Sequence, residues 1–292
     1  MNFTGRSPLW VSVVIYAGLL VFVCRFMPAA ACAMDIDALV FQGTDSHYKG
    51  NLDEAITNFE AAVRLDPGNE FAHNQLGILY AKKHRFKRAF TEFSIVTGLD
   101  ERNTFAQLWL GILHLQNGDM NPAYERFQKI IQIDPNNADA YYFLGAIYIF
   151  RRNPAMAIEF LKKARDADSQ EADTHFRLAK AFHNVDMIAN ALLEYRRTLE
   201  INPSYTKAIN EIGWIYYNRG DIESAITQWK KTLKLNSQDR DAAYNLAKAY
   251  NELAWGKFTA GIKQAAIQNW KKALQVNPGN KAARYYLEKF GS

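Results

Sequence analysis

The chain has 292 residues, with 35 lysines and arginines against 30 aspartates and glutamates, for a formal net charge of +5. The first 33 residues hold two of the basic residues and no acidic one, so the remainder carries only 33 − 30 = +3. That charge is too small to favour a nucleic-acid-binding protein. Both cysteines, Cys24 and Cys32, lie in the same 33 residues, so the remainder has no disulfide, thiolate metal site or cysteine nucleophile.

The first 33 residues also differ in pattern. A charged start precedes an apolar run, Leu9–Cys24, and small residues follow at Ala31-Cys32-Ala33. This order predicts a signal peptide or an N-terminal membrane anchor over residues 1–33, with a mature chain that begins at Met34. At the helical rise the run spans only about 24 Å, less than the ~30 Å hydrocarbon core, which favours cleavage. An uncleaved anchor and a lipoprotein joined through Cys32 remain alternatives. Each of the three predicts an exported protein, which is periplasmic or in the cell envelope if the source is bacterial.

The remainder repeats with a period of 34 residues. A small residue, here named the crossing residue, recurs at this spacing: Gly43, Gly77, Gly111, Gly145, Ala179, Gly213 and Ala247. Twelve residues later comes alanine: Ala55, Ala89, Ala123, Ala157, Ala191 and Ala225. Sixteen residues later comes a large residue, here named the core residue: Phe59, Phe93, Phe127, Leu161, Tyr195 and Trp229. Prolines close four of the units: Pro67, Pro135, Pro203 and Pro278. A 34-residue period predicts a helix–turn–helix repeat whose small residues let the two backbones approach.

These residues resemble the tetratricopeptide repeat; the clearest signature is Ile212-Gly213, Tyr216, Gly220, Ala225 and Trp229. The resemblance covers about residues 36–280. It implies an all-α, right-handed superhelical solenoid of about seven helix–turn–helix repeats followed by a C-terminal capping helix. The expected domains are the solenoid over 34–280 and the cap and tail over 281–292. The expected repeats are 36–69, 70–103, 104–137, 138–171, 172–205, 206–239 and 240–280.

The last repeat holds seven extra residues, because Trp270 follows Trp229 by 41. The crossing residue there is either Ala247 or Ala254. Seven residues make nearly two helical turns, so one long first helix over about 239–260 keeps every face in phase. We therefore expect a longer helix instead of a loop. After it, Lys281–Phe290 reads as an amphipathic helix whose Tyr285, Tyr286 and Phe290 cover the last repeat.

No pattern indicates catalysis. The six histidines show no metal-binding spacing, and no phosphate-binding glycine loop or nucleophile motif is present. His73 and His175 occupy the same repeat position, three repeats apart, and the prediction for them is ordinary packing. The sequence thus predicts no catalytic residues, no cofactor and no metal, and a protein that is not an enzyme.

The resemblance implies that the first helix of each repeat lines a concave surface that binds a partner. Counting from the crossing residue, repeats three and four offer an apolar strip: Phe105, Leu108, Trp109, Ile112, Tyr142, Phe143, Ile149 and Phe150. Repeats five to seven offer aromatic, amide and basic side chains: His183, Asn210, Trp214, Tyr217, Asn218, Tyr244, Asn245 and Lys248. Amides can hydrogen-bond an extended peptide backbone. Self-packing of the strip, or a homo-oligomer, is the alternative.

On the outward-facing second helices, the pairs Lys162-Lys163, Lys230-Lys231 and Lys271-Lys272 are interpreted as a solvated face. The predicted function is a non-enzymatic scaffold or adaptor in a cell-envelope assembly, of the pilus, secretion or exopolysaccharide type. Its partner is a protein or peptide segment, with no nucleic acid, and membrane association through the N-terminal segment is expected in the anchored and lipidated alternatives. The second candidate function is an accessory subunit that presents substrate to a transferase or synthase.

Overall fold

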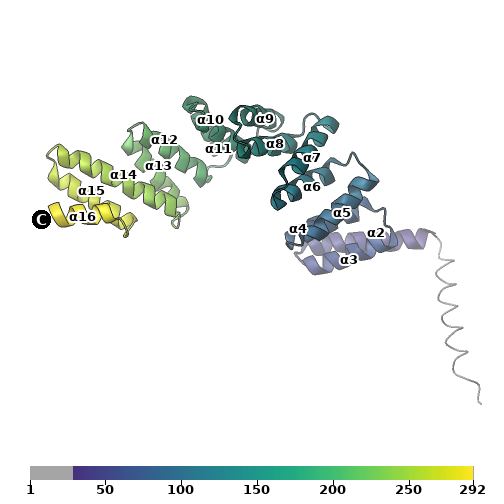
Figure 1. The fold of residues 1–292 in the computed structure, drawn as a ribbon. Coiled ribbons are helices and arrows are strands. Elements are labelled where there is room, and N and C mark those ends of the chain that lie inside the picture. The colour runs from purple at the N-terminus through teal and green to yellow at the C-terminus, as the bar shows by residue number, and fades with distance from the viewer. Residues whose placement is uncertain (1–28, 292) are drawn as a thin grey trace, which may run out of the picture. The chain divides into compact units, whose positions relative to one another are not determined.

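The computed structural model describes residues 29–291, and their side chains from residue 36 onward. Over this range the chain forms fifteen helices and no strand, as the all-helical prediction requires (Figure 1). The helices are α2 Ala29–Tyr48, α3 Leu52–Leu65, α4 Glu70–Lys82, α5 Phe86–Leu99, α6 Thr104–Asn117, α7 Met120–Ile133, α8 Ala138–Phe150, α9 Pro154–Ala167, α10 Ala172–Asn184, α11 Ile188–Ile201, α12 Thr206–Asn218, α13 Ile222–Leu235, α14 Arg240–Thr259, α15 Lys263–Val276 and α16 Lys281–Phe290.

Most of the predicted leader, residues 1–28, lies outside the described residues. The predicted first residue of the mature chain, Met34, lies within α2, and both the leader and its cleavage stay predictions. No described helix combines the length and the hydropathy that a membrane span requires.

The helices form two compact units, residues 1–126 and 127–292, and α7 contains the boundary. In the first unit, consecutive helices from α2 to α6 pack against one another. In the second unit, each helix from α8 to α16 packs against the next, and Figure 1 shows α14, α15 and α16 side by side. Helices that touch their sequence neighbours are what the 34-residue period predicts.

Four of the crossing glycines lie against the core residues of their own repeats: Gly43, Gly77, Gly145 and Gly213. A Cβ atom built on Gly77 would lie 2.5 Å from the Phe93 ring, and one built on Gly145 would lie 2.6 Å from Leu161 Cγ. The core residues are fully buried, as are the alanines twelve residues after each crossing residue. The prediction that small residues permit this close approach is confirmed at these four glycines, because a Cβ atom at any of them would already lie less than 3.0 Å from the core residue.

Each turn from one repeat to the next is closed by an Asp or Asn side chain that accepts a hydrogen bond from the backbone N–H two residues later. These residues are Asp66, Asp100, Asp134, Asp168, Asn202, Asn236 and Asn277. Most first helices then begin with an Asn or Asp cap that accepts from the N–H three residues later, as Asn69 does from Ala72 and Asn103 from Ala106. The predicted prolines lie inside these turns.

The extra residues of the last repeat lengthen its first helix. α14 runs from Arg240 to Thr259, so the expected long helix is present in place of a loop. Ala247 and Ala254 are both fully buried. Ala254 stands sixteen residues before the buried Trp270, which is the spacing from crossing residue to core residue in every other repeat.

α16 covers the end of the last repeat, as predicted. The Tyr286 ring lies 5.1 Å from Trp270, and the Phe290 ring lies 4.5 Å from Phe258. Tyr285 differs from the prediction, because its side chain is 53% exposed. The crossing position of α16 is Glu288. No second helix follows it within the described residues, and a small residue is needed only where a second helix crosses.

Candidate functional site

A pocket of about 510 Å³ lies on the side of the second unit that is formed by the first helices α10, α12 and α14. Its lining residues are Phe176, Lys180, Lys207, Asn210, Glu211, Trp214, Asp241 and Asn245; we name it the amide pocket. It brings together three of the predicted site residues, Asn210, Trp214 and Asn245. The prediction did not name the other five lining residues, Phe176, Lys180, Lys207, Glu211 and Asp241. They stand at the repeat positions from which the predicted site residues were counted, so that count would also have found them.

Asn245 differs from the exposed side chain that its repeat position predicts. It is only 5% exposed, and no hydrogen bond of its side chain occurs within the described residues. Asn210 is more constrained, because Thr232 Oγ1 donates to Asn210 Oδ1 at 2.8 Å. That contact leaves the Asn210 amide nitrogen as a donor, with only a long 3.5 Å contact to Asp239. The pocket therefore offers one constrained amide, Asn210, and one amide, Asn245, that forms no hydrogen bond within the described residues and opens onto the pocket.

The charged side chains of the pocket form two sets. Lys180 pairs with Glu211 at 3.0 Å, and His183 lies 3.7 Å from the same carboxylate, which links α10 to α12. Lys207 and Asp241 form no ion pair within the described residues. One free cation and one free anion thus flank the two amides.

Next to the pocket, Lys248 on α14 lies over two aromatic rings of α12. Its Nζ is 5.0 Å from the centre of the Trp214 ring and 4.8 Å from that of Tyr217, close enough for cation–π attraction. The Tyr217 hydroxyl donates to Glu252 at 2.5 Å. Burial, and then this hydrogen bond, raise the pKa of Tyr217 well above its ordinary value. Two of the predicted site residues, Tyr217 and Lys248, therefore join neighbouring repeats, while the predicted Asn218 and Tyr244 are exposed.

Tyr142 takes part in a network between repeats. Its hydroxyl contacts the carboxylate of Asp173 and the guanidinium of Arg177, and Tyr205 donates to the same carboxylate at 2.5 Å. Burial alone would raise the pKa of Asp173, but the hydrogen bonds from Tyr142, Tyr205 and Arg177 together hold it below its ordinary value. Tyr142 thus has a structural role beside any role in binding.

A second, smaller pocket of about 270 Å³ lies beside this network, with Asp139, Asp168, Glu171 and Asp173 in its lining. Burial, and then the charges of Glu171 and Asp168, raise the pKa of Asp139. Within the described residues no three acidic, histidine or cysteine side chains are placed to hold a metal ion. The lining of this pocket therefore concentrates negative charge.

The predicted apolar strip is divided between the two units. In the first unit, Phe105 is exposed, Leu108 and Ile112 are half-buried, and Trp109 stacks on the buried Phe93 with ring centres 5.5 Å apart. In the second unit, Phe143 stacks on the buried Phe127 at 5.0 Å, Ile149 is half-buried, and Phe150 is 69% exposed. Two of the aromatics thus partly fill the space between repeats. The prediction of one shared binding surface spans both units and stays a prediction.

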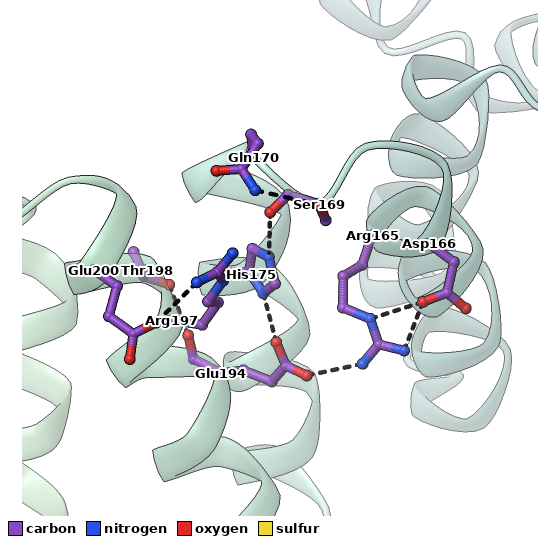
Figure 2. A network of polar contacts seen from close by, with 9 residues as sticks. All are labelled: Arg165, Asp166, Ser169, Gln170, His175, Glu194, Arg197, Thr198 and Glu200. Carbon is purple, nitrogen blue, oxygen red and sulfur yellow. Dashed lines mark hydrogen bonds and ion pairs between the residues drawn. The ribbon is translucent and has the colours of Figure 1, made fainter.

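His73 and His175 each hold the turn before their helix, which goes beyond the ordinary packing predicted for them. His175 Nε2 donates to the Ser169 carbonyl at 3.3 Å, and Nδ1 lies 2.6 Å from Glu194 Oε2 (Figure 2). Because both neighbours of the ring have acceptor oxygens, one proton must lie between Nδ1 and the carboxylate. Glu194, only 5% exposed, also accepts from Arg165 at 2.9 Å.

The same contact recurs in other repeats with other side chains. In each case a side chain donates a hydrogen bond to the backbone carbonyl of the turn residue six positions earlier. The pairs are His73 to Pro67, Gln107 to Glu101, Tyr141 to Pro135, His175 to Ser169 and Arg284 to Pro278. The signal was present in the sequence, since these positions follow the 34-residue period in repeats two to five. It was missed because the residue types differ.

Two family models match the chain. The model described as "TPR repeat" matches residues 45–83 and 213–253, and the model described as "Tetratricopeptide repeat" matches residues 114–181. The chain belongs to the tetratricopeptide repeat family. Together the matches cover about half of the chain and fall in both units, and proteins of this family generally serve as interaction modules instead of catalysts.

Solved structures of tetratricopeptide repeat proteins share the fold. A MamA structure is 26% identical with a TM-score of 0.51, and the match covers 56% of this chain and 95% of that one. Pseudomonas aeruginosa PilF is 17% identical with a TM-score of 0.64, covering 73% and 96%. YrrB, described as a TPR protein with an unusual peptide-binding site, is 19% identical with a TM-score of 0.51, covering 63% and 95%. No curated protein sequence gives a significant match.

Proposed function

We propose that the chain is a non-catalytic scaffold of a cell-envelope assembly that binds an extended polypeptide segment across α10, α12 and α14, with the amide pocket as the anchor. The observation that supports this proposal most directly is Asn245, whose amide forms no hydrogen bond within the described residues and opens onto the pocket. Because the fold does not use this amide, its donor and its acceptor remain available to a bound segment.

A peptide backbone fits the chemistry of the pocket. An asparagine amide both donates and accepts, and each peptide unit offers one acceptor and one donor. Asn210 and Asn245 come from consecutive first helices, so an extended segment that crosses α12 and α14 can bond both. Phe176 and Trp214 supply apolar surface for its side chains, and Lys207 and Asp241 supply one charge of each sign.

We expect Asn245→Ala to weaken peptide binding about tenfold, which corresponds to one hydrogen bond of about 1.4 kcal/mol. Peptides selected from a displayed random library on the full chain serve as the probe, and titration calorimetry gives the dissociation constants. The thermal midpoint should stay about the same, because the change removes an amide that forms no hydrogen bond within the described residues.

The matched control is Asn190→Ala, which removes an exposed amide from the second helix α11, outside the pocket and the predicted groove. Its peptide affinity should equal that of the wild type. A clear loss of stability in Asn245→Ala would show that the amide serves folding. Unchanged affinity in Asn245→Ala would place recognition elsewhere, with Phe150 and the exposed end of the apolar strip as the next site to change.

The envelope part of the proposal is supported by the sequence of residues 1–33, and a pilus, a secretion channel and an exopolysaccharide machine are all compatible with it. The alternative function, an accessory subunit that presents substrate to a transferase or synthase, uses the same pocket. Cross-linking of a photoreactive residue placed at position 218 in the native host distinguishes them. An assembly component in the adduct supports the scaffold, and a catalytic subunit supports the accessory role.

The export prediction has its own test. We expect the protein isolated from its native host to begin at Met34, because signal peptidases accept the small side chains of Ala31-Cys32-Ala33. Intact-mass analysis measures this directly. A mass that retains residues 1–33 would contradict cleavage and favour the anchor, whereas a diacylglycerol adduct on Cys32 would identify a lipoprotein.

A further inference from the structure

A second surface of the second unit carries a repeated pattern of positive charge. In each repeat from four to seven, two basic residues follow the core residue directly. We name the set the basic stripe: Lys162, Lys163, Arg196, Arg197, Lys230, Lys231, Lys271 and Lys272. The first unit lacks the pattern, since Glu60-Ala61 and Ser94-Ile95 stand at these positions in repeats one and two.

The stripe lies on the outer side of the second helices α9, α11, α13 and α15. The preceding core residue of each pair is fully buried. Residues one and two places further along a helix are rotated by about 100° and 200°, so both members of each pair turn away from the core. Seven of the eight side chains are exposed, and Arg197 is half-buried. Because the register is the same in each repeat, the pairs form a row along consecutive helices.

Acidic side chains neutralise little of this row. Within the described residues, only Lys163, with Glu159 at 3.0 Å, and Arg197, with Glu200 at 2.9 Å, form ion pairs. Arg196, Lys231 and Lys271 form neither an ion pair nor a cation–π contact there. α15 contains no aspartate or glutamate at all.

The charge of the whole unit agrees with the stripe. Residues 127–292 contain 24 lysines and arginines and 17 aspartates and glutamates, which gives 24 − 17 = +7. Residues 34–126 contain 9 and 13, which gives 9 − 13 = −4. The modest total of +3 is therefore the sum of two opposite charges, 7 − 4 = +3, and an anionic partner is attracted to the second unit.

Exposed apolar side chains decide which anionic partner fits best. Leu193 lies three residues before Arg196 on α11, and Leu235 lies four residues after Lys231 on α13, so each is a surface neighbour of the stripe. Both are exposed, Leu193 to 65%. Nucleic-acid phosphates gain nothing from such leucines, whereas a phospholipid surface binds cations at its headgroups and apolar side chains just below them.

We propose that the basic stripe docks the second unit on an anionic phospholipid membrane, with Leu193 and Leu235 inserted at the level of the headgroups. This surface lies on the second helices and the amide pocket on the first helices, so the pocket stays accessible while the unit is docked. The proposal is independent of the peptide-binding proposal, and either can fail alone.

The test is flotation of the full chain with phosphatidylcholine vesicles and with vesicles that also contain phosphatidylglycerol. The measured quantity is the ratio of the two partition coefficients, and the leader is common to every variant. Each basic residue near an anionic surface contributes about a fivefold factor to binding. The triple variant Arg196→Glu, Lys231→Glu and Lys271→Glu should therefore lower the ratio about a hundredfold.

A charge-matched control reverses three exposed basic residues outside the second helices, with Arg219→Glu, Arg240→Glu and Lys281→Glu. The control should keep most of the preference for anionic vesicles, and circular dichroism should show equal helix content in both triple variants. An equal loss in the control would mean that net charge alone matters, and the proposal fails. It also fails if the wild type shows no preference for anionic vesicles, or binds polyanionic nucleic acid and not the vesicles.

Discussion

Gly145→Leu should lower the free energy of unfolding of the second unit by about 3 kcal/mol, at the upper end of what overpacking costs. A single Cβ atom on Gly145 would already lie 2.6 Å from Leu161 Cγ and 3.4 Å from the backbone oxygen of Ala157. Leu161 is fully buried, so it cannot move into solvent to make room. Because each repeat is stabilised mainly by its neighbours, the loss should spread from repeat four into repeat five. Urea unfolding followed by circular dichroism measures it.

The matched control is Gly256→Ala, a second glycine within a helix. A Cβ atom there would meet no atom within 4 Å. Alanine should therefore stabilise α14, by up to the roughly 1 kcal/mol that separates the two residues in a helix interior. Gly145→Leu should thus lower the free energy of unfolding, and Gly256→Ala should raise it. Equal stabilities of Gly145→Leu and the wild type would contradict the repeat register and every residue position counted from it.

The helical framework was predictable because its signals repeat. One glycine in a helix is ambiguous, but a small residue every 34 positions followed by a buried large residue fixes two helix faces at once. The long α14 was predictable for the same reason, since its extra seven residues contain no helix breaker and keep both Ala247 and Ala254 on the buried face.

The turns were less well predicted, although their signal is more regular than that of the prolines. Proline occurs at four of the turns, whereas Asp or Asn stands in front of every one. The proline attracted attention because it cannot continue a helix, yet the side-chain oxygen of Asp66 or Asn202 is what closes the turn by accepting a backbone N–H. The polar side chains that donate to the carbonyls of these turns were missed, because four residue types fill this role: histidine, glutamine, tyrosine and arginine.

The site was predictable only in outline, because exposure depends on what the neighbouring repeat supplies. Asn245 was expected to be exposed and is buried, and Tyr142 was expected to be free and holds Asp173. The burial of Asn245 and the contact of Tyr142 with Asp173 cannot be predicted from one repeat alone, because both depend on side chains of a neighbouring repeat. The basic stripe was partly visible as three lysine pairs. It was interpreted as a solvated face because the arginine pair that continues it, Arg196-Arg197, was overlooked and the net charge was summed over both units.

Glu194→Ala should destabilise the second unit by about 3 kcal/mol, which is typical of removing one partner from a buried ion pair. The carboxylate of Glu194 holds His175 of α10 and Arg165 of α9 together, across the boundary between repeats four and five (Figure 2). Without it, the buried imidazole of His175 keeps only its bond to the Ser169 carbonyl. Urea unfolding provides the measurement, and Glu194→Gln, which keeps one acceptor oxygen, should recover part of the loss.

Two further variants test whether this effect belongs to the buried carboxylate and whether it reaches the amide pocket. Glu200→Ala removes an exposed glutamate from the same helix, and its ion pair with Arg197 is worth at most about 1 kcal/mol. Glu92→Ala removes the equivalent contact to His73 in the first unit. Phe176, which lines the pocket, directly follows His175, so Glu194→Ala should also weaken peptide binding, while Glu92→Ala should leave it unchanged. If Glu194→Ala and Glu92→Ala bind the peptide with equal affinity, the network stabilises the repeats without positioning the pocket.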